Sequence, residues 1–325
     1  MKVGVVGLGL IGQKRIGSLT DPCRLTFVCD VSPEKVNEFV SSNKDINHST
    51  DYKDLVASDL VDLVIISTVH NALAPIAEEA LNNGKHVLIE KPGAISLGEI
   101  ERLQALAISQ NKILRVGYNH RFHPAFLMAR SLLEEEKFGK LLWVRARYGH
   151  GGRLGYDKEW RSQKDTSGGG ELIDQGSHLL DLLRYLVGEV ELVFSEIQTA
   201  FWDMEVEDNV YLALRPQVGG FAWLHASWSE WKNTFSFEIT LETAKLEITG
   251  LGGSYGMETL TVYQMKPEMG PPDHQTWQWE ARDSSWDKEM EDILKNINGS
   301  PFIGSNVADG IAVLKIIEQV YTNDH

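Results

Sequence analysis

The sequence predicts an α/β protein with a doubly wound parallel sheet in its first part and a large, open, mostly antiparallel sheet with helices in its second. The chain has 325 residues, more than one ordinary domain and a suitable length for two. Up to about residue 120, short apolar runs alternate with helical patterns, as in a parallel sheet. Longer segments of period-two alternation follow and favour antiparallel strands. We therefore expect one domain at residues 1–120 and a second at residues 121–325.

The first domain is expected to alternate strands and helices. The expected strands are Lys2–Val6, Leu25–Cys29, Leu63–Ser67, His86–Ile89 and Ile113–Val116, and the expected helices are Ile11–Thr20, Pro33–Ser42, Pro75–Asn83 and Leu97–Gln110. Ser96 and Glu99 have capping-box spacing at the start of the last helix, and Gly84 is suited to end the helix before it.

The second domain is expected to be richer in strands. They are Leu141–Tyr148, Val190–Ala200, Val210–Leu214, Phe221–Trp228, Phe235–Ile248 and Leu260–Tyr263. Helices are expected at Glu171–Val187, Ser285–Asn296 and Asn306–Tyr321. The sequence shows no internal repeat and no low-complexity tract.

Composition excludes several classes of function. The net charge of −15 argues against nucleic-acid binding, which needs a basic surface. Apolar runs are too short to cross a bilayer, and the glycine-broken start lacks the cleavage site of a signal peptide. Cys23 and Cys29 form no metal-binding pattern, so we expect no metal. A reducing cytoplasm is the expected compartment.

A glycine turn follows the first expected strand and reads Gly7-Leu8-Gly9-Leu10-Ile11-Gly12. Such a string alone is weak, but here it leaves a strand and opens a helix, as in a Rossmann dinucleotide-binding domain. Gly7 suits the tight turn, Gly9 lets a pyrophosphate approach, and Gly12 allows close helix–strand packing. The alternative is a glycine-rich turn that binds nothing.

Asp30 ends the second expected strand, 18 residues after Gly12. A carboxylate there can accept hydrogen bonds from the ribose hydroxyls and would repel a 2′-phosphate. No arginine follows directly, since the next residues are Val31, Ser32 and Pro33. We therefore expect NAD in preference to NADP, although Asp30 could also simply cap its loop.

The segment Glu90-Lys91-Pro92 follows the strand His86–Ile89. Proline biases Lys91 towards an extended conformation. The lysine would then lie at the carboxyl edge of the sheet, where ligands of doubly wound folds bind. The plainer alternative is a surface lysine.

A further polar group lies on the expected helix Glu171–Val187, after a run of three glycines. Asp174 and His178 stand at positions i and i+4, on one helix face. Taken alone, such a pair is more often a structural hydrogen bond than a catalytic one.

These motifs together resemble the glucose–fructose oxidoreductase/inositol dehydrogenase family (Gfo/Idh/MocA) over essentially the whole chain. The resemblance rests on the glycine turn, on Ala74-Pro75-Ile76-Ala77 with Gly84-Lys85-His86-Val87 and Glu90-Lys91-Pro92, on Gly117-Tyr118-Asn119-His120-Arg121-Phe122, on Trp160-Arg161, and on Gly168 to His178. It implies a Rossmann domain followed by an α+β substrate domain, and hydride transfer to or from a nicotinamide.

The resemblance also implies roles for particular residues. His178 is expected to be the acid/base, Lys91 its electrostatic and proton-relay partner, and Asp174 the group that orients the substrate or the imidazole. Either Lys91 or His178 could take the proton first. The expected cofactor-binding residues are Gly7, Gly9, Leu10, Ile11, Gly12, Asp30, Thr68, His70, Asn71, Glu90, Lys91, Asn119, Trp160 and Arg161. The expected substrate-binding residues are Lys91, Arg121, Arg153, Tyr156, Asp174 and His178.

The chain departs from the family pattern after the strand Leu63–Ser67. Family members often have Thr-Pro there and a histidine just before Ala-Pro, whereas this chain has Thr68-Val69 and Leu73. The loop should still border the nicotinamide ribose, but we assign no proton transfer to His70.

The loop His150-Gly151-Gly152-Arg153-Leu154-Gly155-Tyr156 offers backbone N–H groups and a guanidinium, which suit phosphate or carboxylate. We therefore expect an NAD-dependent dehydrogenase or reductase acting on a sugar, most simply a sugar nucleotide. The alternatives are a dehydrogenase of free sugars or cyclitols such as inositol, and a non-catalytic protein that senses NAD or a sugar. A homodimer or homotetramer is expected, because an apolar sheet face needs covering.

Overall fold

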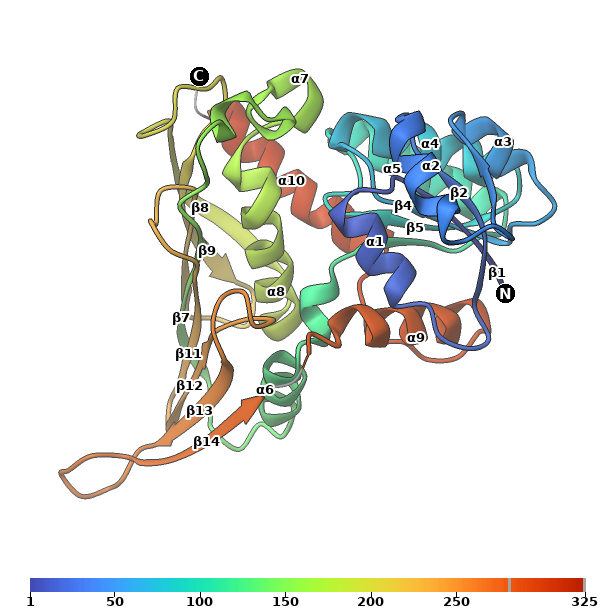
Figure 1. Ribbon diagram of the computed structural model, residues 1–325. Helices are drawn as coiled ribbons and strands as arrows, with labels where there is room; N and C mark the ends of the chain where they lie inside the picture. Colours follow the sequence, from blue (N-terminus) through green and yellow to red (C-terminus); the bar gives the residue numbers. More distant parts are fainter. Residues whose placement is uncertain (280–281, 324–325) are drawn as a thin grey trace. The chain divides into compact units, whose positions relative to one another are not determined.

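The computed structural model describes residues 1–279 and 282–323, which form two compact units (Figure 1). The first unit contains Met1–Asn119, Asp165–Gly168 and Trp286–Leu314. The second contains His120–Lys164, Gly169–Ser285 and the chain from Lys315 onward. Within the described residues, no helix combines the length and the apolar character that crossing a bilayer requires.

The first unit is built on a six-stranded parallel sheet with the strand order β3-β2-β1-β4-β5-β6. This is the order of a dinucleotide-binding Rossmann sheet. The strands are β1 (Lys2–Val6), β2 (Arg24–Cys29), β3 (Asn47–Ser49), β4 (Leu63–Ile66), β5 (His86–Glu90) and β6 (Leu114–Gly117). All the expected strands of this domain are confirmed to within a residue or two.

Helices flank this sheet: α1 (Leu10–Gly17), α2 (Pro33–Ser41), α3 (Tyr52–Ala57), α4 (His70–Asn82), α5 (Leu97–Ser109) and α9 (Ser285–Ile297). Residues 3–6 of β1 and all of β4 are apolar and buried, as burial on both faces of the sheet requires. Met290, Ile293 and Leu294 of α9 join Val3, Val5 and Leu63 in one core cluster. A segment from the far end of the chain therefore completes this unit.

Two local predictions for this unit were wrong or incomplete. The helix expected to start at Pro75 starts at His70 and contains Pro75. Buried Leu73 and Ala74 favour the helix, and their burial outweighs the backbone hydrogen bond that proline removes. The sequence reading also missed β3, which is short and polar, and α3, which has only six residues and is capped by the Asp51 side chain.

The second unit contains an eight-stranded sheet in the order β14-β13-β12-β11-β7-β10-β9-β8. The strands are β7 (Leu141–Gly149), β8 (Val190–Gln198), β9 (Asn209–Pro216), β10 (Phe221–Ser227), β11 (Thr234–Leu241), β12 (Ala244–Thr249), β13 (Glu258–Gln264) and β14 (Asp273–Trp279). Neighbouring strands run antiparallel except for β7 and β10. The expected open, mostly antiparallel sheet is confirmed.

The sequence reading missed several details of this unit. The segment expected as one strand, Phe235–Ile248, is the hairpin of β11 and β12, which pair with each other. β14 and the helix α6 (Pro124–Glu134) were not expected, although Pro124 occupies a favoured first helical position. The expected helix Glu171–Val187 begins with a π-helical turn, Leu172–Gly176, before α8 (Ser177–Val187). The last helix, α10 (Val307–Asn323), lies within two residues of its predicted bounds.

Candidate active site

The glycine turn between β1 and α1 has the geometry that its sequence predicts. Gly7 has a φ of +96°, and a Cβ there would lie 2.3 Å from the Ser67 carbonyl oxygen. A Cβ on Gly12 would lie 1.8 Å from the Gly7 carbonyl oxygen. A Cβ on Gly9, in contrast, would meet no atom within 4 Å. Close packing thus explains Gly7 and Gly12, and Gly9 leaves open space at the start of α1 for a phosphate to approach.

Asp30 lies at the carboxyl end of β2 and is buried. Its Oδ2 accepts a hydrogen bond from the Leu8 backbone N–H at 2.8 Å, and its Oδ1 accepts one from the Ser32 N–H at 3.0 Å. The Lys35 Nζ lies 3.8 Å from Oδ2. Asp30 therefore braces the glycine turn, and a lysine lies beside its charge.

The Glu90–Lys91 turn follows β5. Glu90 is buried and accepts a hydrogen bond from the Arg15 Nε at 2.6 Å, whereas Lys91 is partly exposed. The Lys91–Pro92 peptide bond is cis. Glu90 thus binds α1 through Arg15, so a direct contact between its side chain and a cofactor remains only a prediction.

Thr68, His70 and Asn71 lie between β4 and the first turn of α4. The His70 Nδ1 lies 2.8 Å from the Ser167 carbonyl oxygen, and the Asn71 amide donates to the Asp165 carbonyl oxygen at 3.1 Å. Both side chains therefore fasten the segment Asp165–Gly168 within the first unit.

His178 lies in the first turn of α8 and is buried. Its ring stacks on that of His120, with centroids 3.8 Å apart and an angle of 12° between the planes. His120 in turn lies 3.1 Å from the Tyr148 hydroxyl. The sequence reading did not include His120 and Tyr148 among the site residues. His120 stands inside the motif around Asn119 and could have been found there, and the alternation of β7 places Tyr148 on the buried face.

Asp174 lies on the π-helical turn that precedes α8. Its Oδ2 accepts a hydrogen bond from the Arg161 Nε at 3.1 Å, and the Arg161 guanidinium lies 4.5 Å from the centre of the Trp160 ring. Burial would lower the pKa of Arg161. Its interactions with Asp174, and with Tyr156 and Glu159, outweigh this effect and raise the pKa overall. The two motifs Trp160-Arg161 and Asp174 therefore meet in the second unit.

Two tyrosines stand close to this group: Tyr148 is buried and Tyr255 is partly exposed. Burial, with added negative charge from Tyr255, Asp174 and Glu171, raises the pKa of Tyr148 well above its usual value. Burial and Glu171 raise the pKa of Tyr255 to about 12. The Gln175 amide donates to the Tyr255 hydroxyl at 2.9 Å. Both phenols stay neutral at physiological pH and can act as hydrogen-bond donors or acceptors.

Two of the three glycines before this helix, Gly169 and Gly170, pack closely against Tyr321 and Glu207. A Cβ on Gly170 would lie 2.0 Å from the Glu207 carbonyl oxygen, and one on Gly169 would lie 2.0 Å from the Tyr321 hydroxyl. The Glu207 carboxylate accepts hydrogen bonds from the N–H groups of Gly170 and Leu172. These contacts fix the start of the segment that carries Asp174 and His178.

The remaining expected substrate residues lie in different surroundings. Arg121 is buried and donates two hydrogen bonds to the Asp181 carboxylate, at 2.8 and 2.6 Å. Arg153 is 70% exposed and pairs with Glu159 at 2.7 Å. Tyr156 is buried beneath the same loop, against Trp228. Asn119, an expected cofactor-binding residue, ends the first segment of the first unit and is buried as well. Only Arg153 therefore presents its charge to solvent.

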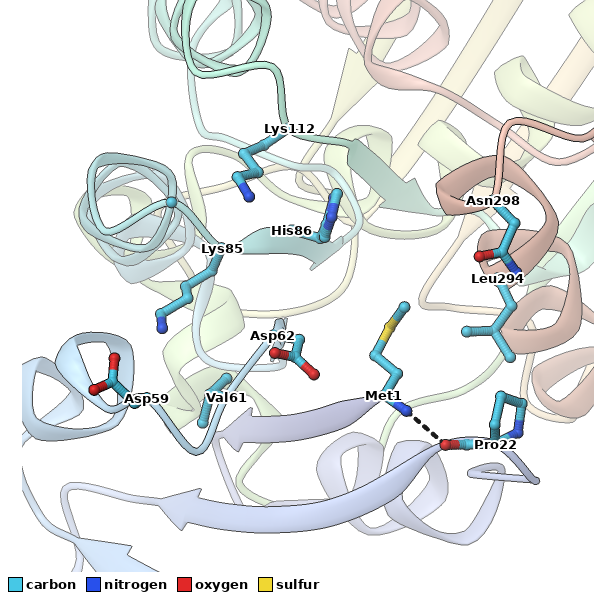
Figure 2. Close-up of a pocket in the computed structure, with 11 residues that line it drawn as sticks. Met1, Pro22, Asp59, Val61, Asp62, Lys85, His86, Lys112, Leu294 and Asn298 are labelled. Carbon is cyan, nitrogen blue, oxygen red and sulfur yellow. Dashed lines mark hydrogen bonds between the residues drawn. The ribbon is translucent and has the colours of Figure 1, made fainter.

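A groove of about 530 Å³ lies at the opposite edge of the Rossmann sheet, at the amino ends of its strands (Figure 2). Two lysines and two aspartates line it: Lys85, Lys112, Asp59 and Asp62. The Lys85 Nζ donates to the Ser58 carbonyl oxygen at 2.8 Å. This groove differs from the predicted dinucleotide site. Its lysines and aspartates balance in charge, and it lies away from the glycine turn.

Strand order and glycine turn define the first unit as a Rossmann dinucleotide-binding domain. Residues 1–118 match the oxidoreductase family with an NAD-binding Rossmann fold, and residues 126–254 match the Gfo/Idh/MocA C-terminal domain. The chain belongs to the Gfo/Idh/MocA oxidoreductase family. The expected family membership and an NAD-binding fold are thereby confirmed.

Relatives with assigned names match parts of the chain. A 1-carboxy-3-chloro-3,4-dihydroxycyclohexa-1,5-diene dehydrogenase of Comamonas testosteroni is 31% identical over 57% of this chain and 47% of its own length. Levoglucosan dehydrogenase of Pseudarthrobacter phenanthrenivorans is 29% identical over 68% of this chain and 60% of its own length. The matched regions thus span about half to three fifths of these relatives.

Solved structures share the fold over nearly the full chain. Levoglucosan dehydrogenase in complex with NADH and L-sorbose has a TM-score of 0.88 at 22% identity and covers 98% of this chain and 95% of its own. The WlbA dehydrogenase from Bordetella pertussis, in complex with NADH and UDP-GlcNAcA, has a TM-score of 0.83 at 21% identity, with the same coverage. At such identities the likeness concerns the fold.

Proposed function

We propose that this chain transfers hydride between NAD and a secondary alcohol or ketone of a sugar, and that the sugar is nucleotide-linked. One observation supports the proposal most strongly: the chain has both an open glycine turn and a buried Asp174–His178 group. A protein that only sensed NAD or a sugar would have no need of the second group.

The residues of the first unit fit a dinucleotide. The space at Gly9 and the free N–H groups at the start of α1 suit a pyrophosphate, and Leu10 is exposed beside them. Each oxygen of the Asp30 carboxylate keeps a lone pair for a ribose hydroxyl after accepting one backbone N–H. NAD supplies the hydride acceptor or donor when it is bound.

Proton transfer is assigned to His178, Lys91 and Asp174. His178 takes the hydroxyl proton of the carbinol when the sugar is oxidised, since an imidazole titrates near physiological pH. Lys91 polarises the same oxygen and relays the proton. Asp174, held by Arg161, orients the substrate hydroxyl or the imidazole. Arg121 is left out of the proposed substrate contacts, because Asp181 engages its guanidinium twice.

The nucleotide part of the substrate is assigned to Arg153. Its exposed guanidinium and the neighbouring glycines suit a diphosphate. The pairing of Arg153 with Glu159 favours the second candidate, a free sugar or cyclitol, because it already balances the charge. Arg153→Ala should raise the KM for UDP-sugars about tenfold or more and leave that for free sugars unchanged. An unchanged KM for every UDP-sugar would remove the diphosphate assignment.

Turnover itself tests the proposal. The purified chain should reduce NAD, seen as absorbance of the reduced nicotinamide, with at least one member of a panel of UDP-sugars, free sugars and cyclitols. Tight NADH binding without turnover on any of them, in either direction, would favour the sensing function instead.

A further inference from the structure

Arg15 of α1 is completely buried and lies between two carboxylates from distant parts of the chain. Its Nε donates to the Glu90 Oε1 at 2.6 Å, and its Nη2 lies 2.5 Å from the same oxygen. Its Nη1 donates to the Glu289 carboxylate. One guanidinium thus joins the helix of the glycine turn, the end of β5 and the helix α9.

Helix α9 contributes twice to this group. Glu289 supplies one carboxylate, and the Trp286 ring lies 4.5 Å from the guanidinium carbon of Arg15. Figure 1 shows α9 running beside α1 in the first unit, although about 270 residues of sequence separate Arg15 from Glu289. We call Arg15, Glu90, Trp286 and Glu289 the arginine cluster.

The neighbouring strand leaves room for the cluster. Gly117 of β6 pairs with Glu90 in the sheet register. A Cβ on Gly117 would lie 2.5 Å from the Arg15 Nη2 and 3.2 Å from the Glu90 Oε1. The glycine of the motif around Asn119 therefore makes space for the buried ion pair.

The arginine cluster is not the main group that holds α9 on the sheet, because other contacts of that helix do so. Asp292, one turn after Glu289, accepts a hydrogen bond from Arg115 of β6 at 2.9 Å. The same carboxylate accepts the backbone N–H groups of Ile303 and Gly304. Met290 and Ile293 add apolar contacts with the sheet. The Glu289–Arg15 pair therefore has a further effect, which is to hold the carboxylate of Glu90, the residue directly before Lys91.

We propose that Arg15, Glu289 and Trp286 are positioning residues for Lys91: they fix Glu90 and thereby the turn that presents the lysine. The inference rests on the proposed role of Lys91 in proton transfer. Its physical basis is that a buried guanidinium shared by two carboxylates permits little movement, because separating any of these charges leaves another buried and unpaired. A displacement of about 1 Å in a reacting group can reduce the rate about 100-fold.

The first test measures Lys91 directly and needs no substrate. The chain is acetylated with an amine-selective reagent at fixed pH, and the rate at Lys91 is measured by mass spectrometry against Lys85 and Lys112 in the same sample. Glu289→Ala should speed labelling of Lys91 about threefold or more, because loss of the Arg15–Glu289 pair loosens the turn and makes the lysine more accessible to the reagent.

The matched control is Asp292→Ala, which removes a buried carboxylate from the same helix and breaks the other arginine pair. It should destabilise the protein at least as much as Glu289→Ala, yet leave the labelling of Lys91 relative to Lys85 unchanged. Each variant is measured about 10 °C below its own Tm. Equal effects of the two variants on Lys91 would overturn the inference.

Kinetics provides the second test, with levoglucosan or a UDP-sugar, whichever gives turnover. Glu289→Ala and Arg15→Lys should lower kcat about tenfold or more, while the Kd for NADH changes less than about threefold. Glu289→Gln keeps an acceptor for Arg15 and should restore most of kcat. If Arg15 only stabilises α1, the Kd for NADH of these variants should rise while kcat stays unchanged. That result would refute the positioning role. Near-normal turnover of Lys91→Met would instead remove the proposed function of Lys91.

Discussion

Lys91 is the residue on which the proposed reaction depends most directly. Replacing it by methionine keeps an unbranched side chain, shorter by the terminal atom, and removes the ammonium group. We expect Lys91→Met to lower kcat by about two to four orders of magnitude, because both polarisation of the substrate oxygen and proton relay are lost. Stopped-flow absorbance of the reduced nicotinamide measures the chemical step.

Lys85 provides the control for this prediction. It precedes the same strand, and its Nζ donates to the Ser58 carbonyl oxygen at the other edge of the sheet. Lys85→Met should leave kcat within about threefold of the parent value, since the residue lies far along β5 from the turn. A Lys91→Met variant as active as Lys85→Met would end the catalytic assignment.

Asp30 carries the predicted preference for NAD. Because it also accepts the Leu8 and Ser32 N–H groups, Asp30→Ala would disturb the glycine turn as well as the charge. Asp30→Asn removes the charge and keeps one acceptor oxygen, so it retains one of the two backbone hydrogen bonds. We expect Asp30→Asn to weaken the preference for NAD: kcat/KM with NAD divided by kcat/KM with NADP should fall on the order of tenfold. This corresponds to about 1.4 kcal/mol.

Lys35 supplies the opposite change at the same place. Its Nζ lies 3.8 Å from Asp30 and offsets part of the carboxylate's charge. Lys35→Ala should therefore widen the preference for NAD. If neither substitution alters the ratio of the two cofactors, Asp30 serves the glycine turn alone.

At the scale of elements, the strand β5 contains a pH-sensitive contact at its amino end. The His86 Nδ1 accepts a hydrogen bond from the Ile113 N–H at 3.1 Å, which requires that nitrogen to be unprotonated. Burial and the nearby Lys112 lower the pKa of His86, with Asp62 opposing them. Figure 2 shows His86 at the groove beside Lys112 and Asp62. Protonation would break the contact between β5 and the start of β6.

The direction of the pH effect follows from this lowered pKa. Above the ordinary histidine pKa of about 6.5, both folded and unfolded chains are neutral at His86, and its contribution to stability is complete. As the pH falls below that value, the unfolded chain binds a proton first, so the stability decreases towards the folded-state pKa. His86→Gln should flatten the fall of Tm between about pH 7 and 5. The exposed His48→Gln is the control, and equal slopes for both variants would contradict the prediction.

The elements that the sequence predicted best are those with a strong local pattern. The buried strands of the Rossmann sheet and the capped helix α5 follow from short apolar runs and from Ser96. The hairpin of β11 and β12 was read as one strand, because Glu242 and Thr243 at its turn include no glycine or proline. The π-helical turn before α8 depends on the packing of Gly170 against Glu207, which local pattern does not contain.

The same distinction applies to the candidate site. The glycine turn, Asp30, Lys91 and the Asp174–His178 pair could be named as candidates from the sequence, because each stands in a short continuous segment. Arg15, Glu289 and the stacking of His120 on His178 could not, because each depends on residues brought together by the fold. The ligand of the loop around Arg153 could not be predicted from the sequence for another reason, because the guanidinium is 70% exposed and pairs with Glu159 of the chain itself.

At the scale of the whole molecule, the outer face of the eight-stranded sheet carries an apolar patch. Trp143 on β7 pairs across strands with Phe221 on β10, and Trp223 and Phe194 lie on the same face. All four side chains are 37 to 50% exposed. Exposed aromatic residues gathered on one sheet face are typical of a surface that another molecule covers. We predict that a second copy of the chain covers it, which gives a homodimer or, with another contact, a homotetramer.

Charge placed in this patch tests the prediction. The double variant Trp143→Glu/Trp223→Glu should lower the molar mass in sedimentation velocity from that of an oligomer to that of the 36.4 kDa chain. In a two-fold interface the new carboxylates of one copy would be buried close to the same carboxylates of the other copy, and their repulsion would separate the copies. Trp231→Glu is the matched control, since Trp231 is 75% exposed and lies in the loop after β10. A monomeric parent chain, or an oligomer that both changes leave intact, would show that the sheet face is not the interface. Loss of the oligomer in the control alone would move the interface to the loops that also carry Arg153.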